Sequence, residues 1–333
     1  MPLSYTVQES EQEGVAVVEL CDVVREQCAR IAPALGASCF GYRVNHEGTT
    51  RHILEPPPNL TTFADRLTGY GTPILFPFPN RIRDGRWTYR GETYQFADSG
   101  PGRNHIHGLV YNRPWQVDAL VATPDAAVCT MTFDSLDHDE VGAQYPFPFV
   151  LAAQYTLRDS SLSLRFAATN VGETAMPMGV GFHPYFSAPI ASETQPADCL
   201  ITVPADGYWE LDAFLPTGDI RQVQDDHDLR KGRPFEGMRF DDVFTQVVLD
   251  EDGLSRCIVD DRGIGLRTVV ESDAIFRELV VYTPPGRRSI CFEPYTCPTD
   301  APNLTARGLN VGLIELAPEE TFTGTMRIVA EPT

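Results

Sequence analysis

The sequence of 333 residues is poor in basic side chains, with 26 lysines and arginines against 46 aspartates and glutamates and a net charge of −20. Nucleic acids and anionic membranes attract basic surfaces, so this deficit argues against either as the main partner. No run approaches the roughly 18 consecutive apolar residues that cross a bilayer as a helix. The N-terminal segment, residues 1–14, has neither a basic start nor an apolar core, so no signal peptide is predicted.

Paired cysteine motifs are also missing. The eight cysteines are scattered and no two form a C-x-x-C unit, which argues against a zinc ribbon or a dithiol redox motif. We therefore expect eight buried, reduced thiols in a cytoplasmic protein. They are Cys21, Cys28, Cys39, Cys129, Cys199, Cys257, Cys291 and Cys297.

Long helices have little room, because 27 prolines are spread along the chain. Residues 161–166 alternate between apolar and polar, as a half-buried strand does. Residues 247–270 read as a meander, and residues 86–94 and 280–292 read as hairpins with tight turns. The sequence therefore predicts an all-β protein, a large antiparallel β-sandwich with few short helices. Without repeats or a linker, residues 1–333 are expected to form a single domain.

One segment has a different pattern. Val17, Leu20, Val24, Cys28 and Ile31 recur at helical spacing, and this pattern by itself predicts a helix over 17–31. A short helix is also expected over 62–67.

A histidine and a glutamate stand out by their surroundings. His183 lies in the aromatic run VGFHPYF, and Glu293 ends the apolar run SICFE. A structural reading makes His183 a hydrogen-bonded core residue. Because a buried carboxylate without a partner is costly, Glu293 more readily indicates a functional or ion-paired group.

Other candidate residues follow apolar runs or lie close to one another. Arg81 follows PILFPFPN, where it is either an exposed turn residue or a fixed donor for ligand oxygens. His105 and His107 share one face if the segment GRNHIHG is extended. Asp241 and Asp242, in RFDDVFT, are either solvated or acceptors for ligand hydroxyls.

Taken in order, PILFPFPNRIRDG, NHIHG, GFHPYF, FDDVF and FEPYT resemble the motifs of the aldose 1-epimerase (galactose mutarotase) family. The resemblance runs from about Ala32 to the C-terminus. It implies a large antiparallel β-sandwich and, in place of the helix over 17–31, two short strands. The activity it implies is interconversion of the α and β anomers of a free hexose such as glucose or galactose, in the absence of a cofactor or metal.

The resemblance also assigns residues. It implies that His183 is the general acid and Glu293 the general base. Arg81, His107 and Asp241 match residues that hold the sugar, and Asn80 and Tyr185 flank two of the motifs. We prefer Asp241 to Asp242 because it keeps the D-x-x-F spacing. The sequence departs from many members at Phe182 and Ser187, where asparagine is common.

These residue types suit the chemistry. Opening a pyranose ring requires a base that takes the proton of the C1 hydroxyl and an acid that protonates the ring oxygen. Glutamate and histidine have pKa values that neighbouring groups can bring toward neutrality.

Four other functions stay open. A carbohydrate-binding or sugar-sensing module would have the same fold without the chemistry. His105, His107 and His183 with Glu293 form a candidate metal set. Asp241 and Glu293 are candidate glycosidase carboxylates. A hexose 6-phosphate epimerase would need a basic cluster, for which the sequence offers Arg81, Arg83, Arg86 and Arg103.

Overall fold

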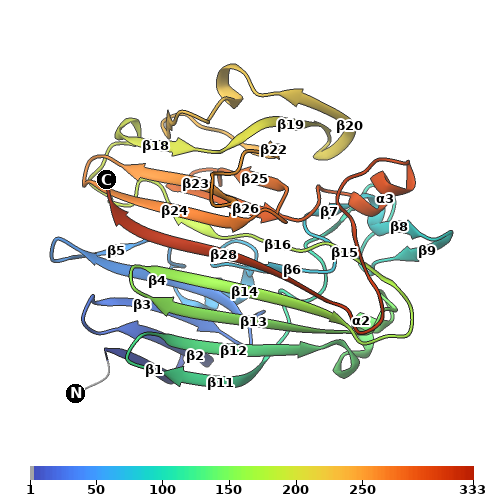
Figure 1. Cartoon of the computed structure of the whole chain (residues 1–333), viewed down its shortest axis with the longest axis horizontal. Coiled ribbons are helices and arrows are strands. Elements are labelled where there is room, and N and C mark those ends of the chain that lie inside the picture. Colours follow the sequence, from blue (N-terminus) through green and yellow to red (C-terminus); the bar gives the residue numbers. More distant parts are fainter. Residues whose placement is uncertain (1–3) are drawn as a thin grey trace.

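The computed structural model describes residues 4–333, about half of which lie in β-strands, and most of these strands belong to three large antiparallel sheets (Figure 1). The all-β prediction is confirmed. The sequence predicted no signal peptide over residues 1–14. The first three of these residues lie outside the described residues. Over residues 4–333, no helix is long and apolar enough to cross a membrane.

The nine-stranded sheet forms one face of the molecule. Its strands alternate between buried and half-exposed residues, as expected for a sheet with one face toward solvent. In spatial order they are β11 (Gln116–Ala122), β12 (Ala127–Asp134), β13 (Phe149–Arg158), β14 (Ser161–Asn170), β28 (Thr321–Pro332), β24 (Leu266–Asp273), β23 (Leu254–Asp261), β18 (Cys199–Thr202) and β21 (Arg233–Pro234).

Two further sheets complete the sandwich. The five-stranded sheet contains β1 (Tyr5–Gln12), β2 (Val15–Asp22), β3 (Gln27–Ala32), β4 (Ser38–His46) and β5 (Thr49–His52). The eight-stranded sheet contains, in order, β20 (Leu215–Gln222), β19 (Ala205–Asp212), β22 (Asp241–Val247), β25 (Glu278–Tyr282), β26 (Ser289–Tyr295), β16 (Gly181–Phe182) and β6 (Ile74–Leu75), with β17 (Tyr185–Ser187) also paired to β26.

The remaining elements are short. Three two-stranded ribbons pair β7 (Arg81–Ile82) with β10 (His105–Ile106), β8 (Arg86–Tyr89) with β9 (Glu92–Gln95), and β15 (Met176–Met178) with β27 (Ile314–Leu316). The α-helices are α1 (Leu60–Asp65), α2 (Asp139–Gly142) and α3 (Ala301–Ala306), and the 3-10 turns are η1 (Arg83–Gly85), η2 (Ser135–Asp137), η3 (Pro196–Asp198) and η4 (Asp225–His227).

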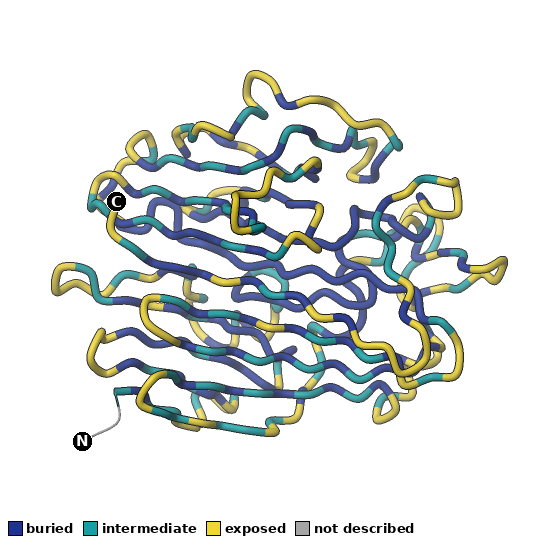
Figure 2. The backbone as a smooth tube through the Cα atoms, in the orientation of Figure 1, coloured by how far each residue is buried: buried dark blue, intermediate teal, exposed yellow. Residues whose placement is uncertain are grey.

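The core lies between the sheets. Leu20 from the five-stranded sheet, Leu151 from the nine-stranded sheet and Phe292 from the eight-stranded sheet belong to one buried cluster (Figure 2). Burying one such side chain contributes about 1.5–3 kcal/mol. Because side chains alternate along a strand, Phe292 faces this core and Glu293 faces the other side of the eight-stranded sheet. The candidate site lies on that second side.

The helix predicted over 17–31 is wrong. The segment forms β2 and β3, paired antiparallel with Cys21 opposite Cys28, as the family resemblance implied. Val18 and Leu20 face the main core, while Val17 packs on the opposite side with Phe63 of α1. The apparent helical spacing arises because two strands, each with apolar residues, are joined by a turn in which Val24 is exposed.

The other predicted elements are largely confirmed. The hairpins are β8–β9 and β25–β26, and the helix expected over 62–67 is α1, two residues earlier. The meander over 247–270 is only half correct. β23 and β24 pair with each other, but β22, which ends at Val247, belongs to the eight-stranded sheet.

The expectation of eight free thiols needs correction. Cys21 and Cys28, directly opposite each other on β2 and β3, form a disulfide. The other six cysteines are free and buried. Sequence spacing gave no sign of this bond, because it depends on the register of two neighbouring strands.

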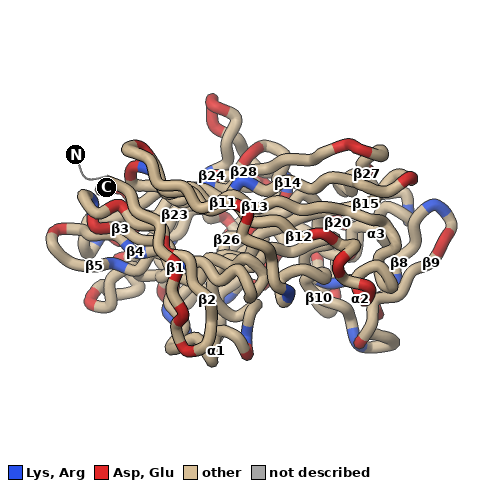
Figure 3. The backbone as a smooth tube through the Cα atoms, turned by 90° about the horizontal axis from the view of Figure 1, so that it is seen from below, with Lys and Arg blue, Asp and Glu red and all other residues tan. Residues whose placement is uncertain are grey.

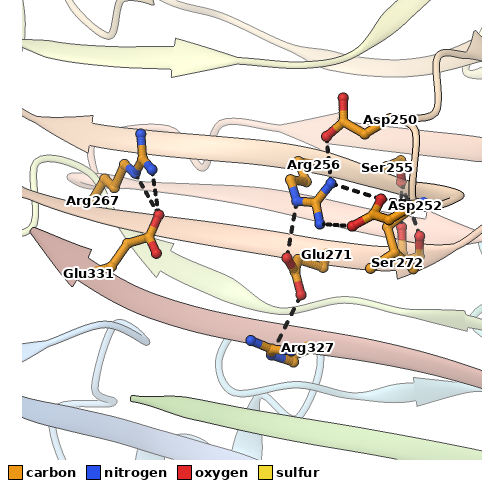
Figure 4. Close-up of polar contacts among 10 residues, drawn as sticks. Asp250, Asp252, Ser255, Arg256, Arg267, Glu271, Ser272, Arg327 and Glu331 are labelled. Carbon is orange, nitrogen blue, oxygen red and sulfur yellow. Dashed lines mark hydrogen bonds and ion pairs between the residues drawn. The ribbon is translucent and has the colours of Figure 1, made fainter. Parts of the chain in front are cut away.

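Charged groups gather on the surface. Acidic residues are spread along the backbone, many of them in loops and turns (Figure 3). On the solvent face of the nine-stranded sheet, Arg256 of β23 contacts Asp250, Asp252 and Glu271, and Glu271 also contacts Arg327 of β28 (Figure 4). These ion pairs link three adjacent strands, β23, β24 and β28.

Candidate active site

A cavity of about 500 Å³ opens beside the eight-stranded sheet. All seven residues that the sequence proposed for the site lie in its wall, although they come from segments up to 213 residues apart in the chain. The complete lining is Arg66, Thr68, Gly69, Tyr70, Asn80, Arg81, Ile106, His107, His183, Tyr185, Asp241, Tyr282, Pro284, Pro285, Arg287 and Glu293.

His183 and Glu293 lie side by side in this wall. His183 is on the connection between β16 and β17, where its backbone N–H donates to the carbonyl of Pro73. Glu293 is on β26, the strand with which both β16 and β17 pair. The Nδ1 atom of His183 lies 3.4 Å from Oε1 of Glu293, and both side chains are at least nine-tenths buried.

A tyrosine hydroxyl contacts the other polar atom of each of these two side chains. The hydroxyl of Tyr295 donates to Oε2 of Glu293. The hydroxyl of Tyr185 donates to the carbonyl of Thr68 and lies 3.4 Å from Nε2 of His183. Since this hydroxyl has used its proton, it accepts from Nε2–H, and this assigns the bare nitrogen to Nδ1, which faces Glu293.

Burial pushes both groups toward their neutral forms. It lowers the pKa of His183 to about 3, with Arg287 and Arg81 adding to the shift. It raises the pKa of Glu293 well above its ordinary value, against the hydrogen bond from Tyr295, which lowers it. Both shifts favour the neutral forms, a protonated Glu293 carboxyl beside an unprotonated nitrogen of His183.

Arg81 connects several polar groups of the wall. One guanidinium nitrogen donates to Oδ1 of Asn80 at 2.9 Å, and another lies 3.7 Å from Oδ2 of Asp241. The guanidinium also lies over the ring of Phe214, at 4.7 Å from its centre. Burial raises the pKa of Asp241, whereas Arg81 lowers it.

His107 packs next to His183, with ring centres 5.3 Å apart. Burial and the nearby His183 and Arg81 hold the pKa of His107 well below its usual value, so the ring is neutral. Its backbone N–H donates to the carbonyl of Asn80, which joins the two motifs. His105 has a different environment, because it stacks on Phe96 and contacts the carbonyl of Gly108 outside the cavity.

Strand alternation separates the two adjacent aspartates of β22. Asp241 lines the cavity, whereas Asp242 contacts His227 at 3.5 Å and is absent from the wall. The two departures from the family motifs also lie elsewhere. Phe182 packs in the core against Phe166 and Phe276, and Ser187 is buried outside the lining.

Sequence reasoning missed Arg287, Tyr282 and Tyr70. Arg287 pairs with Glu55 and lies over the rings of Tyr70 and Tyr185, at 4.2 and 4.9 Å from their centres. The pairing with Glu55 spans 232 residues, so no local pattern distinguishes Arg287 from its neighbour Arg288.

The arginines that suggested a phosphate site are dispersed. Among Arg81, Arg83, Arg86 and Arg103, only Arg81 lines the cavity. Arg83 lies 3.9 Å from Asp300, and Arg103 lines a neighbouring depression.

Two groups of side chains in residues 4–333 have metal-ligand geometry. Glu19 lies near Cys21 and Cys28, whose sulfurs are joined to each other. His183, Cys291 and Glu293 form the other group, which differs from the set of three histidines considered from sequence because His105 faces elsewhere.

The fold and the wall together define a class of protein, a large antiparallel β-sandwich with a buried histidine–glutamate contact in a polar cavity. The family model "Aldose 1-epimerase" matches residues 25–329, so the chain belongs to the aldose 1-epimerase family.

The chain is also similar to proteins from other organisms. The uncharacterised protein YihR of Escherichia coli is 27% identical over 247 residues, which are 73% of this chain and 74% of the relative. A galactose mutarotase-like protein from Clostridium acetobutylicum superposes with a TM-score of 0.90 at 24% identity, over 99% of each chain. Galactose 1-epimerase from Lactobacillus acidophilus superposes with a TM-score of 0.77 at 19% identity, again over 99% of each chain. The two superpositions show the same fold, galactose mutarotase-like.

Proposed function

We propose that this protein is an aldose 1-epimerase that interconverts the α and β anomers of a free, neutral hexose such as glucose or galactose. The observation that carries the proposal is the contact between His183 and Glu293 inside a polar cavity of about 500 Å³. Pockets of this size hold small ligands, and a hexose fits the class of substrate that the family acts on.

The reaction is a paired proton transfer. Glu293 takes the proton of the C1 hydroxyl while His183 protonates the ring oxygen, so that the C1–O5 bond breaks and a C1 aldehyde forms. Rotation about C1–C2 presents the other face of the aldehyde, and the reverse transfers close the ring. Each positioned proton transfer contributes roughly 10²–10⁴ in rate.

The proton of the pair must first be on the right partner. In the empty site Glu293 is protonated and Nδ1 of His183 is bare, 3.4 Å away. Transfer of that proton from Glu293 to His183 produces the carboxylate base and the imidazolium acid together. Sugar hydroxyls stabilise these charges by hydrogen bonding, which replaces part of the hydration that burial removed.

The remaining wall residues orient the sugar. Arg81, Asn80 and His107 supply donors and acceptors beside the reacting pair, and Asp241 accepts from sugar hydroxyls. Tyr185 fixes the His183 ring by stacking at 4.8 Å. Two of the three arginines in the wall, Arg81 and Arg287, are already paired with carboxylates, which favours a neutral hexose over a hexose 6-phosphate.

Polarimetry tests the proposal. Wild-type protein should accelerate mutarotation of freshly dissolved α-D-glucose or α-D-galactose, and Glu293→Gln and His183→Asn should each remove the acceleration. Glu278→Gln is the matched control, since Glu278 is also a buried glutamate of the same sheet but lies outside the cavity wall. It should retain the activity.

Three outcomes would contradict the proposal. Sugar binding by calorimetry without acceleration would indicate a binding module. Acceleration confined to hexose 6-phosphates would indicate the phosphorylated substrate. Release of reducing sugar from glycosides would indicate a hydrolase that uses Asp241 and Glu293.

A further inference from the structure

A buried thiol lies beside the acid–base pair. Cys291 and Glu293 are two residues apart on β26, so their side chains share one face of the strand. His183 reaches the same place from the β16–β17 connection, because β17 pairs with β26 with Tyr185 opposite Cys291. The Nδ1 or Nε2 atom of His183, the Sγ of Cys291 and a carboxylate oxygen of Glu293 all lie within 4.8 Å of one another.

These three donors have the chemistry of a zinc site. Imidazole nitrogen, thiolate sulfur and carboxylate oxygen are the ligands that Zn²⁺ takes in proteins, whereas Mg²⁺ and Ca²⁺ prefer oxygen alone. Three protein ligands with a fourth position toward an open cavity is also the arrangement of zinc sites that exchange a ligand. His183 and Glu293 line that cavity, which gives the ion a path inward.

A second observation points to a ligand at this place. Nδ1 of His183 is buried and lacks a hydrogen-bond partner among the described residues, although it lies close to Glu293. The other ring nitrogen is held by Tyr185, and the other oxygen of Glu293 is held by Tyr295. Outer contacts of this kind orient metal ligands and fix the histidine tautomer.

We propose that His183, Cys291 and Glu293 form a Zn²⁺-binding site, and that Zn²⁺ bound there inhibits the enzyme. On binding, Nδ1, the sulfur and a carboxylate oxygen each donate an electron pair to Zn²⁺, and the thiol and carboxyl protons leave to solvent. Inhibition rests on the proposed function, because the ion occupies the acid and the base that the epimerase reaction requires. Binding of the ion does not depend on that function.

Calorimetric titration with Zn²⁺ and absorption spectroscopy with Co²⁺ test the site directly. Metal-free wild-type protein should bind one Zn²⁺ at this site, and Co²⁺ should give a thiolate-to-metal charge-transfer band. The titrations are done in the presence of excess Mg²⁺, which occupies weak carboxylate sites on the acidic surface. Omission of reductant keeps Cys21 and Cys28 bonded to each other, so that they supply no thiolate.

Cys291→Ser and Cys291→Ala should abolish the band and weaken Zn²⁺ binding at least about 100-fold, since outer contacts alone contribute 10–100-fold. Two variants are used so that a folding defect in one leaves the other informative. Cys297→Ser is the matched control, because Cys297 is equally buried and free but outside the cluster. It should bind as wild type does.

The results separate the two proposals. Unchanged affinity in both Cys291 variants, or no thiolate band in wild type, overturns the zinc site while leaving the epimerase intact. Cys291-dependent binding by a protein that does not accelerate mutarotation supports the site and overturns the proposed function. Polarimetry with Zn²⁺ should show inhibition of wild type that is reversed by a chelator. Full activity of the zinc-loaded protein overturns the inhibitory role.

Discussion

Glu293 shows how single residues set the chemistry of this cavity. Its carboxyl is almost fully buried and accepts a hydrogen bond from the hydroxyl of Tyr295, two residues further along β26. This hydrogen bond lowers the pKa of Glu293 against the larger effect of burial. Tyr295 therefore acts as a positioning residue that keeps the carboxylate form accessible.

Replacement of Tyr295 by phenylalanine removes this bond and should raise the pKa of Glu293 further. In the proposed reaction the pair works with one proton. The acid limb of the kcat/KM profile should therefore lie below the ordinary pKa of histidine, because burial lowers the pKa of His183, and the alkaline limb should lie above the ordinary pKa of glutamate, because burial raises the pKa of Glu293. Tyr295→Phe should lower kcat/KM about tenfold, the usual effect of a hydrogen bond to a charged group, and move the alkaline limb upward. A lower rate with an unmoved limb would indicate a merely structural role.

Glu278 is a second buried carboxyl, and it belongs to stability rather than to the proposed reaction. One oxygen accepts from the indole N–H of Trp209 at 3.0 Å, while the other lies 4.0 Å from Nε of Arg277. Burial raises the pKa of Glu278 from 4.5 to about 7. The folded state therefore holds this proton over a range in which the unfolded state has released it.

A raised pKa means that stability is complete below about pH 4.5 and is lost as pH rises toward 7. Wild type should lose about 3 kcal/mol of unfolding free energy relative to Glu278→Gln over this range, from about 2.5 pH units at 1.36 kcal/mol each. Urea unfolding of both proteins at pH 4.5 and pH 8 measures the difference. Parallel pH dependences would show that Glu278 does not hold its proton.

Sequence motifs identified candidate site residues one at a time, but not the residues that contact them from other parts of the chain. His183 and Glu293 were recognisable because a polar group in an apolar run is costly and therefore conspicuous. Arg287 was not, since a turn sequence with two adjacent arginines gives no indication of which one meets Glu55 from another part of the chain. Contacts of this kind depend on the closed sandwich.

Among the elements, the hairpin of β2 and β3 carries the largest difference between sequence and structure. Helical spacing over 17–31 was misleading because Val17 packs with the cluster around α1 while its neighbours Val18 and Leu20 face the main core, and Val24 lies exposed in the turn between β2 and β3. The same pairing brings Cys21 and Cys28 together, which no spacing rule anticipates.

The disulfide should stabilise this hairpin modestly, because the loop it closes is short, with the two cysteines only seven positions apart. Loop entropy gives about 2 kcal/mol, so a reductant should lower the midpoint of thermal unfolding of wild type. Cys21→Ser should have a lower midpoint that is insensitive to reductant. If alkylation of the unfolded, unreduced protein labels all eight cysteines, the expectation of eight free thiols was right.

At the scale of the whole molecule, the family and the fold class were predictable from ordered motifs and short alternating segments. The distribution of strands between sheets was not. β22 and β23 are consecutive in the sequence, but β22 lies in the eight-stranded sheet and β23 in the nine-stranded sheet. The reason is that strand pairing also depends on partners that are distant in sequence.

Whether residues 1–333 form a single domain stays a prediction. One core cluster joins the three large sheets, so we expect them to unfold together. Scanning calorimetry should show one transition whose calorimetric enthalpy equals the van't Hoff enthalpy. Two resolved transitions would contradict the single-domain prediction.

Gly108, which follows His107, limits how the cavity of this protein can be redesigned. The backbone N–H of Leu109 donates to the carbonyl of Phe76, and Gly108 has a φ of +74°. A Cβ atom at Gly108 would lie 2.1 Å from that same oxygen. Random libraries aimed at a changed ligand preference should leave this glycine fixed and vary Arg66, Thr68 and Ile106, which line the cavity.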